Sequence, residues 1–498
     1  MGIFANPLTD LLEYEDFSRD FLKGTDPVGM TGCIDSEKVH FMSTFLGEKK
    51  VQLVVTYNEQ RAREIEEDYK LFCSQVYVIP PRDLIFFSAD LQGNAIIAER
   101  MKAFAALYQN EAKVIITTMD ALMSAAVPFE QLMSHVIKLK EGDELDLEKL
   151  KHDLTVMGYE RVGRVEEPGQ FTVHGGIADV YPLTMEVPVR IELWGDEIDT
   201  IRCFEPQSQR SMDQIECVSV FPAAEVIADD TARRRAAGMI QNELESQLAV
   251  FKKAKEPDKA KRLREETNRI LEALGEDVVL EAPDSYISYF YPRTVQLSEY
   301  FDEKNTLVFL DEPMRLKERG DGVQAEFEES MKNRLEQGFL LPGQTALLTP
   351  AKHVLAAFER GQVAALSSLD SRLADFTVVN SYAVNVQNMN TYREGFELLI
   401  KDLTHWKKEK YRIVLLCPSR TRANRIVNQL IEYDLLAYYS EDEDKKINPG
   451  EIMVTYGNLH RGFLYPMLKF AVITESDIFG VKKKKKEKKS HYQGQRIS

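Results

Sequence analysis

The chain has 498 residues, of which 44% are hydrophobic and 29% are charged, as is ordinary for a water-soluble protein. A chain of this length exceeds what one hydrophobic core usually holds, so we expect several domains. It contains no run of eighteen or more apolar residues, and its first residues lack the basic, apolar and small-residue regions of a signal peptide. The sequence therefore predicts neither a membrane protein nor a secreted one.

The formal net charge is −17, although residues 482–489 read KKKKKEKK and alone contribute +6. The rest of the chain therefore carries −23. Neutralisation of phosphates supplies most sequence-independent affinity for nucleic acids. We therefore expect this acidic body to bind DNA or RNA poorly by itself.

The cysteines are scattered along the chain and are never spaced C-x-x-C. An odd number of isolated cysteines indicates free thiols, which suit a reducing cytoplasm. The same pattern predicts no zinc site. The residues are Cys33, Cys73, Cys203, Cys217 and Cys417.

Strands and helices alternate in the first part of the chain. Helical patterns cover residues 8–23, 35–45, 59–72 and 95–108, and apolar strand patterns cover 52–56, 76–79 and 114–117. Strands separated by helices of this length are typical of βαβ units. We predict an α/β domain built on a parallel sheet.

The first turn of this sheet is where a nucleotide would be expected. A phosphate-binding loop has the pattern G-x-x-x-x-G-K-[ST], whose backbone N–H groups and lysine hold the phosphates. Here Gly29 and Gly32 are only three residues apart, no Lys-Ser/Thr pair follows, and Asp35 and Glu37 add negative charge. We interpret this segment as a degenerate, non-functional nucleotide loop, and more simply as a strand-to-helix turn.

Residues 306–312, TLVFLDE, are similar to a strand end that binds magnesium in nucleotide-dependent proteins. An Asp-Glu pair at a strand end is also common by chance, and without a phosphate loop it has little to act on. We therefore predict no catalytic residue, no cofactor and no metal ion.

From about residue 129 the pattern becomes β-rich. A helix is predicted over 142–157, with Asp146 as a possible N-cap and Gly158 as the C-terminal stop. Along 189–194 aliphatic residues alternate with Arg190, Glu192 and Trp194, and the turn after them reverses the chain. This pattern predicts a hairpin with one buried face, in a small α+β domain inserted into the α/β domain.

Residues 228–275 hold two highly charged helical stretches separated near Pro257. A helical hairpin packed on the protein is the simpler interpretation, and a coiled-coil partner site is the alternative. Strand patterns at 306–310 and 345–348 are then expected to complete the first sheet.

The last folded part alternates again. Strands are predicted at 377–379, 412–417, 451–455 and 470–474, and helices at 392–407 and 420–433. Residues 419–422, Ser-Arg-Thr-Arg, could hold an anion at a helix start, but ordinary capping explains them as well. The lysine-rich tail from residue 481 predicts a disordered linker, with a nuclear signal or nucleic-acid arm as alternatives.

Three blocks of sequence resemble a known family. They are GYERVGRVEEPGQFTVHGGIADVYPL at 158–183, PVRIELWGDEIDTIRCFEPQSQRS at 188–211 and ITESDIFG at 473–480. They resemble the N-terminal part of the bacterial transcription-repair coupling factors, and the resemblance covers essentially the whole chain. The first part of the chain is also similar to the excision-repair protein UvrB.

The resemblance implies a split, degenerate UvrB-like α/β domain with a small α+β domain inserted, then a separate α/β domain and a linker. The expected boundaries are 1–126 and 214–348 for the two parts of the split domain, 127–213 for the inserted domain, 349–480 for the second α/β domain and 481–498 for the linker. Family members continue into an RNA-polymerase-interacting domain and an ATP-dependent DNA translocase. Since this sequence ends in the linker, RNA polymerase and DNA are expected to be bound only through those further domains.

The resemblance also implies a partner, because the inserted domain of these proteins docks the damage-recognition ATPase UvrA. In UvrB, the first α/β lobe also carries an aromatic hairpin that handles damaged DNA. In this chain, residues 88–100 leave no room for such an insertion. Carried over by position, the candidate UvrA-binding residues are Arg161, His174, Gly175, Gly176, Asp179 and Tyr181. The family commonly has arginine where His174 stands.

The leading hypothesis is a non-enzymatic adaptor in the bacterial cytoplasm that docks UvrA. The alternative is an active nucleotide-dependent helicase or ATPase lobe, which would need a hidden phosphate site. A third hypothesis is a structural regulator that masks the translocase through intramolecular contact, and it is compatible with the first.

Overall fold

The computed structural model describes residues 7–82, 91–275, 280, 283–370, 376–392, 395–442 and 445–480. The predicted basic linker at 481–498 lies outside these ranges. The chain divides into a larger compact unit, residues 15–32 and 42–384, and a smaller unit formed by the rest. The predicted multidomain α/β architecture is confirmed.

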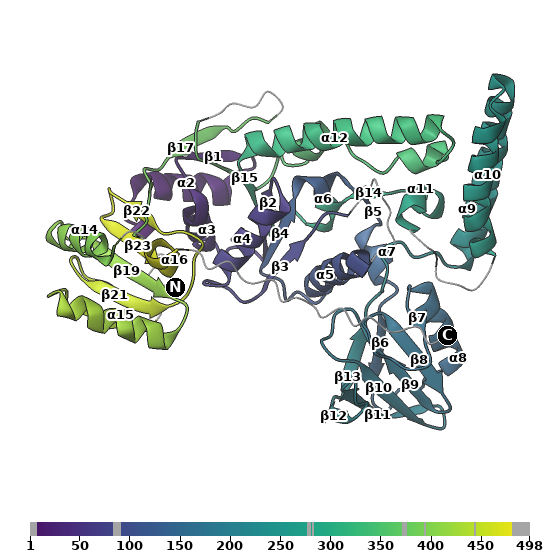
Figure 1. Cartoon of the computed structure of the whole chain (residues 1–498), viewed down its shortest axis with the longest axis horizontal. Coiled ribbons are helices and arrows are strands. Elements are labelled where there is room, and N and C mark those ends of the chain that lie inside the picture. The colour runs from purple at the N-terminus through teal and green to yellow at the C-terminus, as the bar shows by residue number, and fades with distance from the viewer. Residues whose placement is uncertain are drawn as a thin grey trace, which may run out of the picture. The chain divides into compact units, whose positions relative to one another are not determined.

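The larger unit is built on a parallel sheet with the strand order β17-β1-β16-β15-β2-β4-β3 (Figure 1). Every residue of the four central strands is buried, as expected when helices cover both faces of a parallel sheet. The strands are β1 (Val28–Thr31), β2 (Val51–Thr56), β3 (Val76–Ile79), β4 (Val114–Thr118), β15 (Thr306–Asp311), β16 (Val363–Ser367) and β17 (Asn380–Ala383).

Helices of the α/β part follow the strands as the sequence predicts. Asn58 caps the helix after β2 by accepting a 2.8 Å hydrogen bond from the Arg61 N–H. The helices are α2 (Leu12–Lys23), α4 (Glu59–Tyr69), α5 (Leu91–Tyr108), α6 (Met119–Met123), α7 (Phe129–Met133), α12 (Pro313–Glu336) and α13 (Ala351–Ala356). Most of α3 (Asp35–Ser43) belongs to the smaller unit. Strands β5 (Ala125–Ala126) and β14 (Val295–Gln296) form a separate short antiparallel pair.

The first sheet is completed later in the chain than the sequence indicated. The strand expected at 345–348 is wrong, since a 3-10 turn, η3 (Pro342–Thr345), stands there and Leu348 forms only an isolated bridge with Ser124. The strand expected at 377–379 is also misplaced, because β17 begins at Asn380. Strands β16 and β17 therefore extend the sheet beyond residue 348, where the split domain was expected to end.

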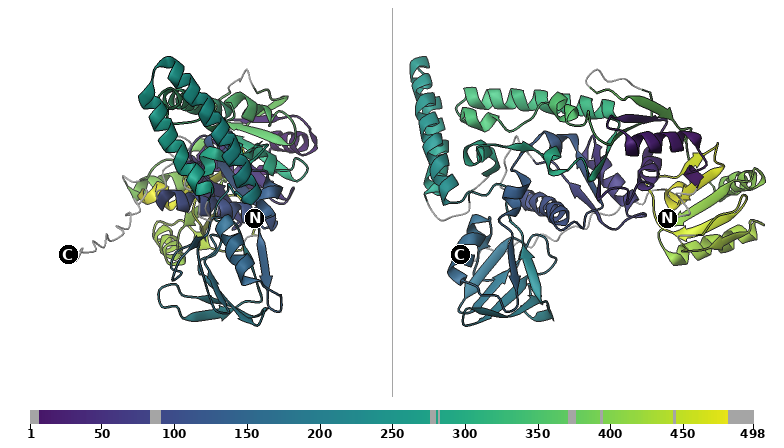
Figure 2. Two further views of the ribbon diagram at one scale, coloured as in Figure 1. Left: turned by 90° about the vertical axis from the view of Figure 1, so that its right-hand side faces the viewer. Right: turned by 180° about the vertical axis from the view of Figure 1, so that it is seen from behind.

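The inserted domain is a mainly antiparallel sheet with the order β12-β11-β10-β9-β8-β7, backed by α8 (Figure 2). A second pair, β6 with β13, joins its start to its end, so the insert continues past the expected boundary at residue 213. Its elements are β6 (Ile137–Lys140), α8 (Leu147–Val156), β7 (Glu160–Arg161), β8 (Gln170–His174), β9 (Ile177–Val180), β10 (Val189–Trp194), β11 (Glu197–Phe204), β12 (Ser211–Gln214) and β13 (Cys217–Val220).

The predicted helical hairpin is confirmed as α9 (Asp230–Ala254) and α10 (Pro257–Leu274), which run side by side (Figure 2). Asp229 caps the first helix, Lys255 ends it in the left-handed conformation with φ 57°, and Pro257 starts the second helix at a position that needs no N–H donor. Within the larger unit, α9 packs against α11 (Ile287–Phe290), and the aliphatic stripes of the hairpin join the main hydrophobic core. The 3-10 turn η1 (Pro283–Tyr286) contacts α11, and η2 (Leu297–Tyr300) contacts α6.

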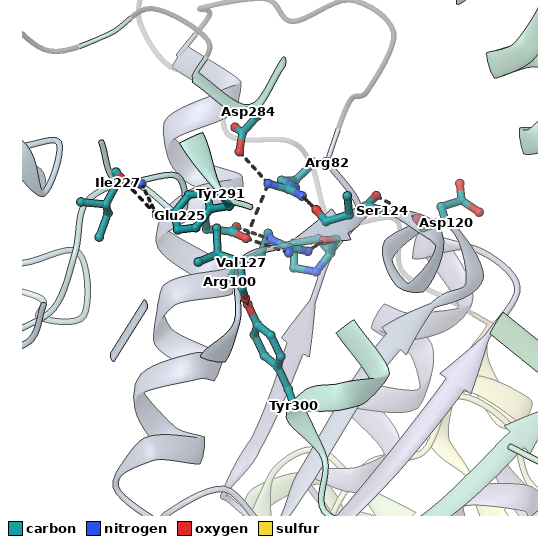
Figure 3. A network of polar contacts seen from close by, with 12 residues as sticks. Arg82, Arg100, Asp120, Ser124, Val127, Glu225, Ile227, Asp284, Tyr291 and Tyr300 are labelled. Atoms are coloured by element: carbon teal, nitrogen blue, oxygen red, sulfur yellow. Dashed lines mark hydrogen bonds and ion pairs between the residues drawn. The ribbon is translucent and has the colours of Figure 1, made fainter. Parts of the chain in front are cut away.

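A buried network of charged residues links the segment that follows the inserted domain to α5 and to the end of β3 (Figure 3). Arg100 on α5 donates to both carboxylate oxygens of Glu225, at 2.5 and 3.0 Å, and to the Pro80 carbonyl at 2.6 Å. Arg82 lies 3.8 Å from the same carboxylate and 2.6 Å from Asp284. Burial alone would raise the pKa of the Glu225 carboxyl, but the charges of Arg100 and Arg82 bring it below its usual value.

The smaller unit has its own sheet, with the order β18-β22-β23-β19-β21-β20. Strands β23, β19, β21 and β20 are parallel, and β22 and β18 add an antiparallel edge. The elements are β18 (Gln387–Asn388), α14 (Phe396–Lys408), β19 (Arg412–Cys417), α15 (Arg420–Glu432), β20 (Ala437–Tyr439), β21 (Ile452–Tyr456), β22 (Phe463–Tyr465), β23 (Phe470–Thr474) and α16 (Glu475–Phe479). Among the described residues, no helix has the length and apolar character needed to cross a bilayer.

Candidate docking surface

Two tight turns lie together at one end of the inserted sheet. Gly175 and Gly176 join β8 to β9, and Gly175 has a φ of 61°, a conformation that favours glycine. Gly195, with a φ of 67°, starts the turn from β10 to β11. Because β9 and β10 are antiparallel, the start of one lies beside the end of the other, and the Leu193 N–H donates to the Gly176 carbonyl at 2.8 Å.

Large apolar side chains are exposed at this end of the sheet. Trp194 is 84% exposed and Ile177 is 41% exposed. His174 pairs with Ile177 across the turn and is exposed as well. Exposed aromatic and aliphatic groups gathered on a rigid sheet are typical of a protein-binding surface, since they gain most from being covered.

Strand register places these three side chains on one face of the sheet. His174 pairs with Ile177, Ile177 pairs with Glu192, and Trp194 follows two residues after Glu192. Side chains alternate between faces along a strand, so paired residues and residues two apart share a face. The opposite face is covered by α8 and forms the hydrophobic core of the insert.

Asp179 is a buried residue that holds Arg190 in place on this outer face. It is only 6% exposed, and Arg190 donates to its two carboxylate oxygens at 2.8 and 2.7 Å. The hydrogen bond to Asp179 raises the pKa of the Arg190 guanidinium, which also lies 4.7 Å above the ring centre of Phe204. The candidate residue Asp179 therefore orients Arg190 and presents little of its own surface.

Tyr181 is also mainly internal. It is 8% exposed, packs with Val165 and Phe204, and donates a 2.6 Å hydrogen bond to the Glu186 carbonyl. Burial raises the pKa of the Tyr181 hydroxyl, so it stays a hydrogen-bond donor at neutral pH. Its position favours a structural role beneath the surface.

Arg161 lies apart from the other candidates. It is exposed on β7, at the edge of the sheet, and pairs in register with Phe171. Phe171 belongs to the face that α8 covers. The structure therefore brings His174, Gly175 and Gly176 together but places Arg161 on the other face.

Sequence reasoning missed Ile177 and Trp194 as members of the exposed end. The signal for Trp194 was present, because its alternation with Arg190 and Glu192 put it on the polar face. A tryptophan on a polar face is unusual for a free surface, since tryptophan is highly buried on average. The position of Ile177 depended on the turn geometry, which the sequence pattern did not resolve.

Gly29 and Gly32 are explained by packing against β17. Gly32 has a φ of 84°, and a Cβ there would lie 1.9 Å from the Val384 carbonyl oxygen. The Val384 N–H donates to the Thr31 carbonyl at 2.8 Å. At Gly29, a Cβ would lie 3.4 Å from the Ser381 hydroxyl. Gly32 thus lets a neighbouring backbone approach closely, whereas a Cβ at Gly29 would make only ordinary contact with side chains.

At the start of α3, a side-chain carboxylate occupies the helix end. Glu37 accepts a 3.1 Å hydrogen bond from the Ile34 N–H and a 2.5 Å hydrogen bond from the Tyr465 hydroxyl, which also lies 3.2 Å from His40 Nδ1. Glu37 is fully buried, and burial raises the pKa of its carboxyl to about 7 against the opposing effect of these hydrogen bonds. A helix end that holds its own carboxylate is a poor place for a phosphate.

The buried Glu37 predicts a pH effect on stability. The folded protein keeps a proton on Glu37 that the unfolded chain releases between pH 4.5 and 7. The protonated Glu37 therefore contributes its full share to the free energy of unfolding below pH 4.5. That contribution, about 3 kcal/mol in total, is lost as the pH rises to 7. We expect Glu37→Gln to remove this decrease in the free energy of unfolding of the smaller unit between pH 4.5 and 7. The measurement is urea-induced unfolding at several pH values, followed by the fluorescence of buried Trp406.

A matched control is Glu432→Gln, an exposed position at the end of α15 in the same unit. It should leave the pH dependence as in the parent chain. An unchanged slope in Glu37→Gln would contradict the assignment.

At the strand end 306–312, the Asp311 carboxylate is buried and hydrogen-bonded to neighbouring side chains. The Asp311 carboxylate is 2% exposed and accepts from the Thr56 hydroxyl at 2.8 Å and from Arg61 Nε at 3.3 Å. The guanidinium compensates the buried negative charge in place of a cation from solution.

Comparison with known proteins identifies related families for two parts of the chain. Residues 137–225 match the family described as the UvrB interaction domain, and residues 405–478 match the family described as the MFD, D3 domain. The first match covers the inserted domain as the structure shows it, including β13.

Two curated relatives align along nearly the whole chain. The chain is 28% identical over 491 residues to the transcription-repair-coupling factor of Bacillus subtilis, covering 97% of this chain and 41% of that protein. It is 27% identical over 494 residues to that of Staphylococcus epidermidis, covering 98% and 41%. The chain thus spans about two fifths of the length of these relatives. The resemblance to the N-terminal region of transcription-repair-coupling factors is confirmed.

Proposed function

We propose that this chain, similar to the N-terminal region of transcription-repair-coupling factors, is a non-catalytic adaptor of transcription-coupled DNA repair. Its inserted domain docks the excision-repair protein UvrA. The observation that carries the proposal is the match of residues 137–225 to a UvrB interaction domain whose sheet ends in an exposed apolar surface. The proposed site of action is the bacterial cytoplasm.

We define the docking surface as His174, the Gly175-Gly176 turn, Ile177 and Trp194. The glycines keep the turn tight, so that the partner can approach the apolar side chains. Arg190, held by Asp179, offers a charged group on the same face, where a partner carboxylate would bind. Arg161 contributes only if UvrA also reaches the far edge of the sheet.

We expect Trp194→Ala to weaken UvrA binding most. An exposed tryptophan that becomes fully covered in a complex typically contributes about 2 kcal/mol or more, which corresponds to about a 30-fold loss of affinity. The measurement is surface plasmon resonance of purified UvrA over the immobilised chain. His174→Ala should give a smaller loss in the same direction.

The matched control is Met212→Ala. Met212 is 52% exposed on β12, at the opposite edge of the same sheet from β7 and away from the two turns. It should change the affinity less than about threefold, as is usual outside a binding centre. Equal losses in Trp194→Ala and Met212→Ala would contradict the proposed surface.

The regulatory part of the proposal concerns a longer protein. Intramolecular contact with C-terminal domains would cover the docking surface and restrain the translocase until transcription stalls, while those domains bind RNA polymerase and DNA. Lower UvrA affinity in the longer protein than in this chain is the expected result. Equal affinities would leave the adaptor role standing and exclude the masking.

A further inference from the structure

The tip of the helical hairpin is strongly basic in an otherwise acidic chain. Residues 252–264 contain seven lysine or arginine residues and two carboxylates, a formal charge of +5. Apart from the tail at 482–489, the chain as a whole carries −23. A local reversal of charge of this size marks a surface that attracts anions.

The cations surround a groove between α9 and α10. The groove has a volume of about 560 Å³ and is lined by Lys252 and Lys255 on one side and by Lys261 and Arg264 on the other. Its carboxylates are already engaged, Glu256 with Lys259 at 2.8 Å and Glu265 with Lys261 at 3.9 Å.

Several of these cations have no counter-charge of their own. In the described part of the chain, the side chains of Lys252, Lys255 and Arg264 are exposed and make no hydrogen bond or ion pair. By contrast, Arg262 on the other side of the hairpin donates to the Gln337 carbonyl at 2.8 Å and covers the ring of Phe339. The structure thus uses Arg262 internally and leaves the groove cations available.

The helix dipole favours cations at the end of α9 but not at the start of α10. Lysines in the last turn of α9 are favoured by the negative end of the helix dipole. At the start of α10 the dipole has the opposite sign, so Lys259 and Lys261 in its first turns oppose it. The ion pairs of Lys259 with Glu256 and of Lys261 with Glu265 offset this cost, so the argument for a ligand rests on the groove cations whose side chains are unpaired.

The chemistry of the groove favours phosphates. The lining contains no aromatic residue on which a base could stack, and its apolar members are limited to Leu248, Ala249, Pro257 and Ala260. Flexible lysines and one arginine spread over two helices suit a chain of regularly spaced charges. We propose that the tip of the α9–α10 hairpin binds the sugar–phosphate backbone of duplex DNA without reading its sequence.

The test uses fluorescence anisotropy with a labelled 30-base-pair duplex from 50 to 200 mM NaCl. All proteins are the full chain with the lysines of 482–489 replaced by glutamine, so that the tail does not mask the hairpin. The variant replaces four groove cations by glutamine, and the control replaces four exposed cations that lack partners within the described residues. The variant is Lys252→Gln, Lys255→Gln, Lys261→Gln and Arg264→Gln, and the control is Lys113→Gln, Lys332→Gln, Lys352→Gln and Arg360→Gln.

Both sets of substitutions change the net charge equally. We expect the groove variant to make the slope of log affinity against log salt shallower by about 3 and to lower affinity at 50 mM NaCl by about 30-fold relative to the control. Equal binding by variant and control would overturn the proposal. So would a loss of binding to polyglutamate with unchanged binding to DNA, because the groove would then take an acidic protein segment.

Discussion

Replacing Glu225 with glutamine should lower the free energy of unfolding of the larger unit by about 3–5 kcal/mol, because it leaves buried arginines without their charge partner. Arg100 and Glu225 have side chains that are only 1% and 4% exposed. The remaining carboxylate, Asp284, contacts Arg82 and lies on the outer side of the network. The measurement is urea-induced unfolding followed by far-ultraviolet circular dichroism.

A double substitution distinguishes a lost charge pair from a general loss of packing. Arg100→Met with Glu225→Leu removes both charges, and we expect it to recover most of the loss, since apolar replacement of a buried pair is often neutral. The control for helix α5 is Glu99→Gln, whose ion pair with Arg63 is partly exposed and should contribute about 1 kcal/mol or less. A Glu225→Gln effect no larger than that of Glu99→Gln would show that the network does not hold the insert in place.

The second large effect is expected at Gly32. Gly32→Ala should cost about 3 kcal/mol or more, because the backbone has a φ of 84° and the new Cβ would meet the Val384 carbonyl oxygen. Relief of that clash would separate β17 from β1, whose register runs from Val28 opposite Asn380 to Thr31 opposite Ala383. The same urea unfolding experiment measures the loss.

Gly47→Ala is the matched control for backbone strain alone. Gly47 has a similar φ of 93°, but a Cβ there meets nothing within 4 Å. Its cost should be about 1 kcal/mol. If both substitutions cost the same, the close approach of the Val384 carbonyl is not the reason for glycine at position 32.

These expectations connect the fold to the proposed role. In the larger unit, the Val384 carbonyl closes the space beside Gly32. In the smaller unit, the Glu37 carboxylate takes the Ile34 N–H at the start of α3. The inserted domain is fastened by the buried network around Glu225. A rigid scaffold that presents one exposed apolar surface is what an adaptor requires.

The sequence by itself determined the α/β class, the alternating strands and helices, the inserted β module and the helical hairpin. These features follow from local periodicity and from residues such as Asp146 and Pro257 that start helices, so no distant contact was needed to predict them. The missing Lys-Ser/Thr after Gly32 was also visible locally. So was the polar face that carries Trp194.

Only the tertiary structure decided which strands close the first sheet and which candidate residues share a face. Strand β17 is short and partly exposed, and its assignment depends on pairing with β1 across some 350 residues, which no local pattern encodes. Arg161 and His174 are close in sequence, yet strand register places them on opposite faces. Asp179 and Tyr181 look like surface residues in the sequence, but their partners Arg190 and Glu186 hold them inside the fold. The docking surface is therefore defined by pairing across strands.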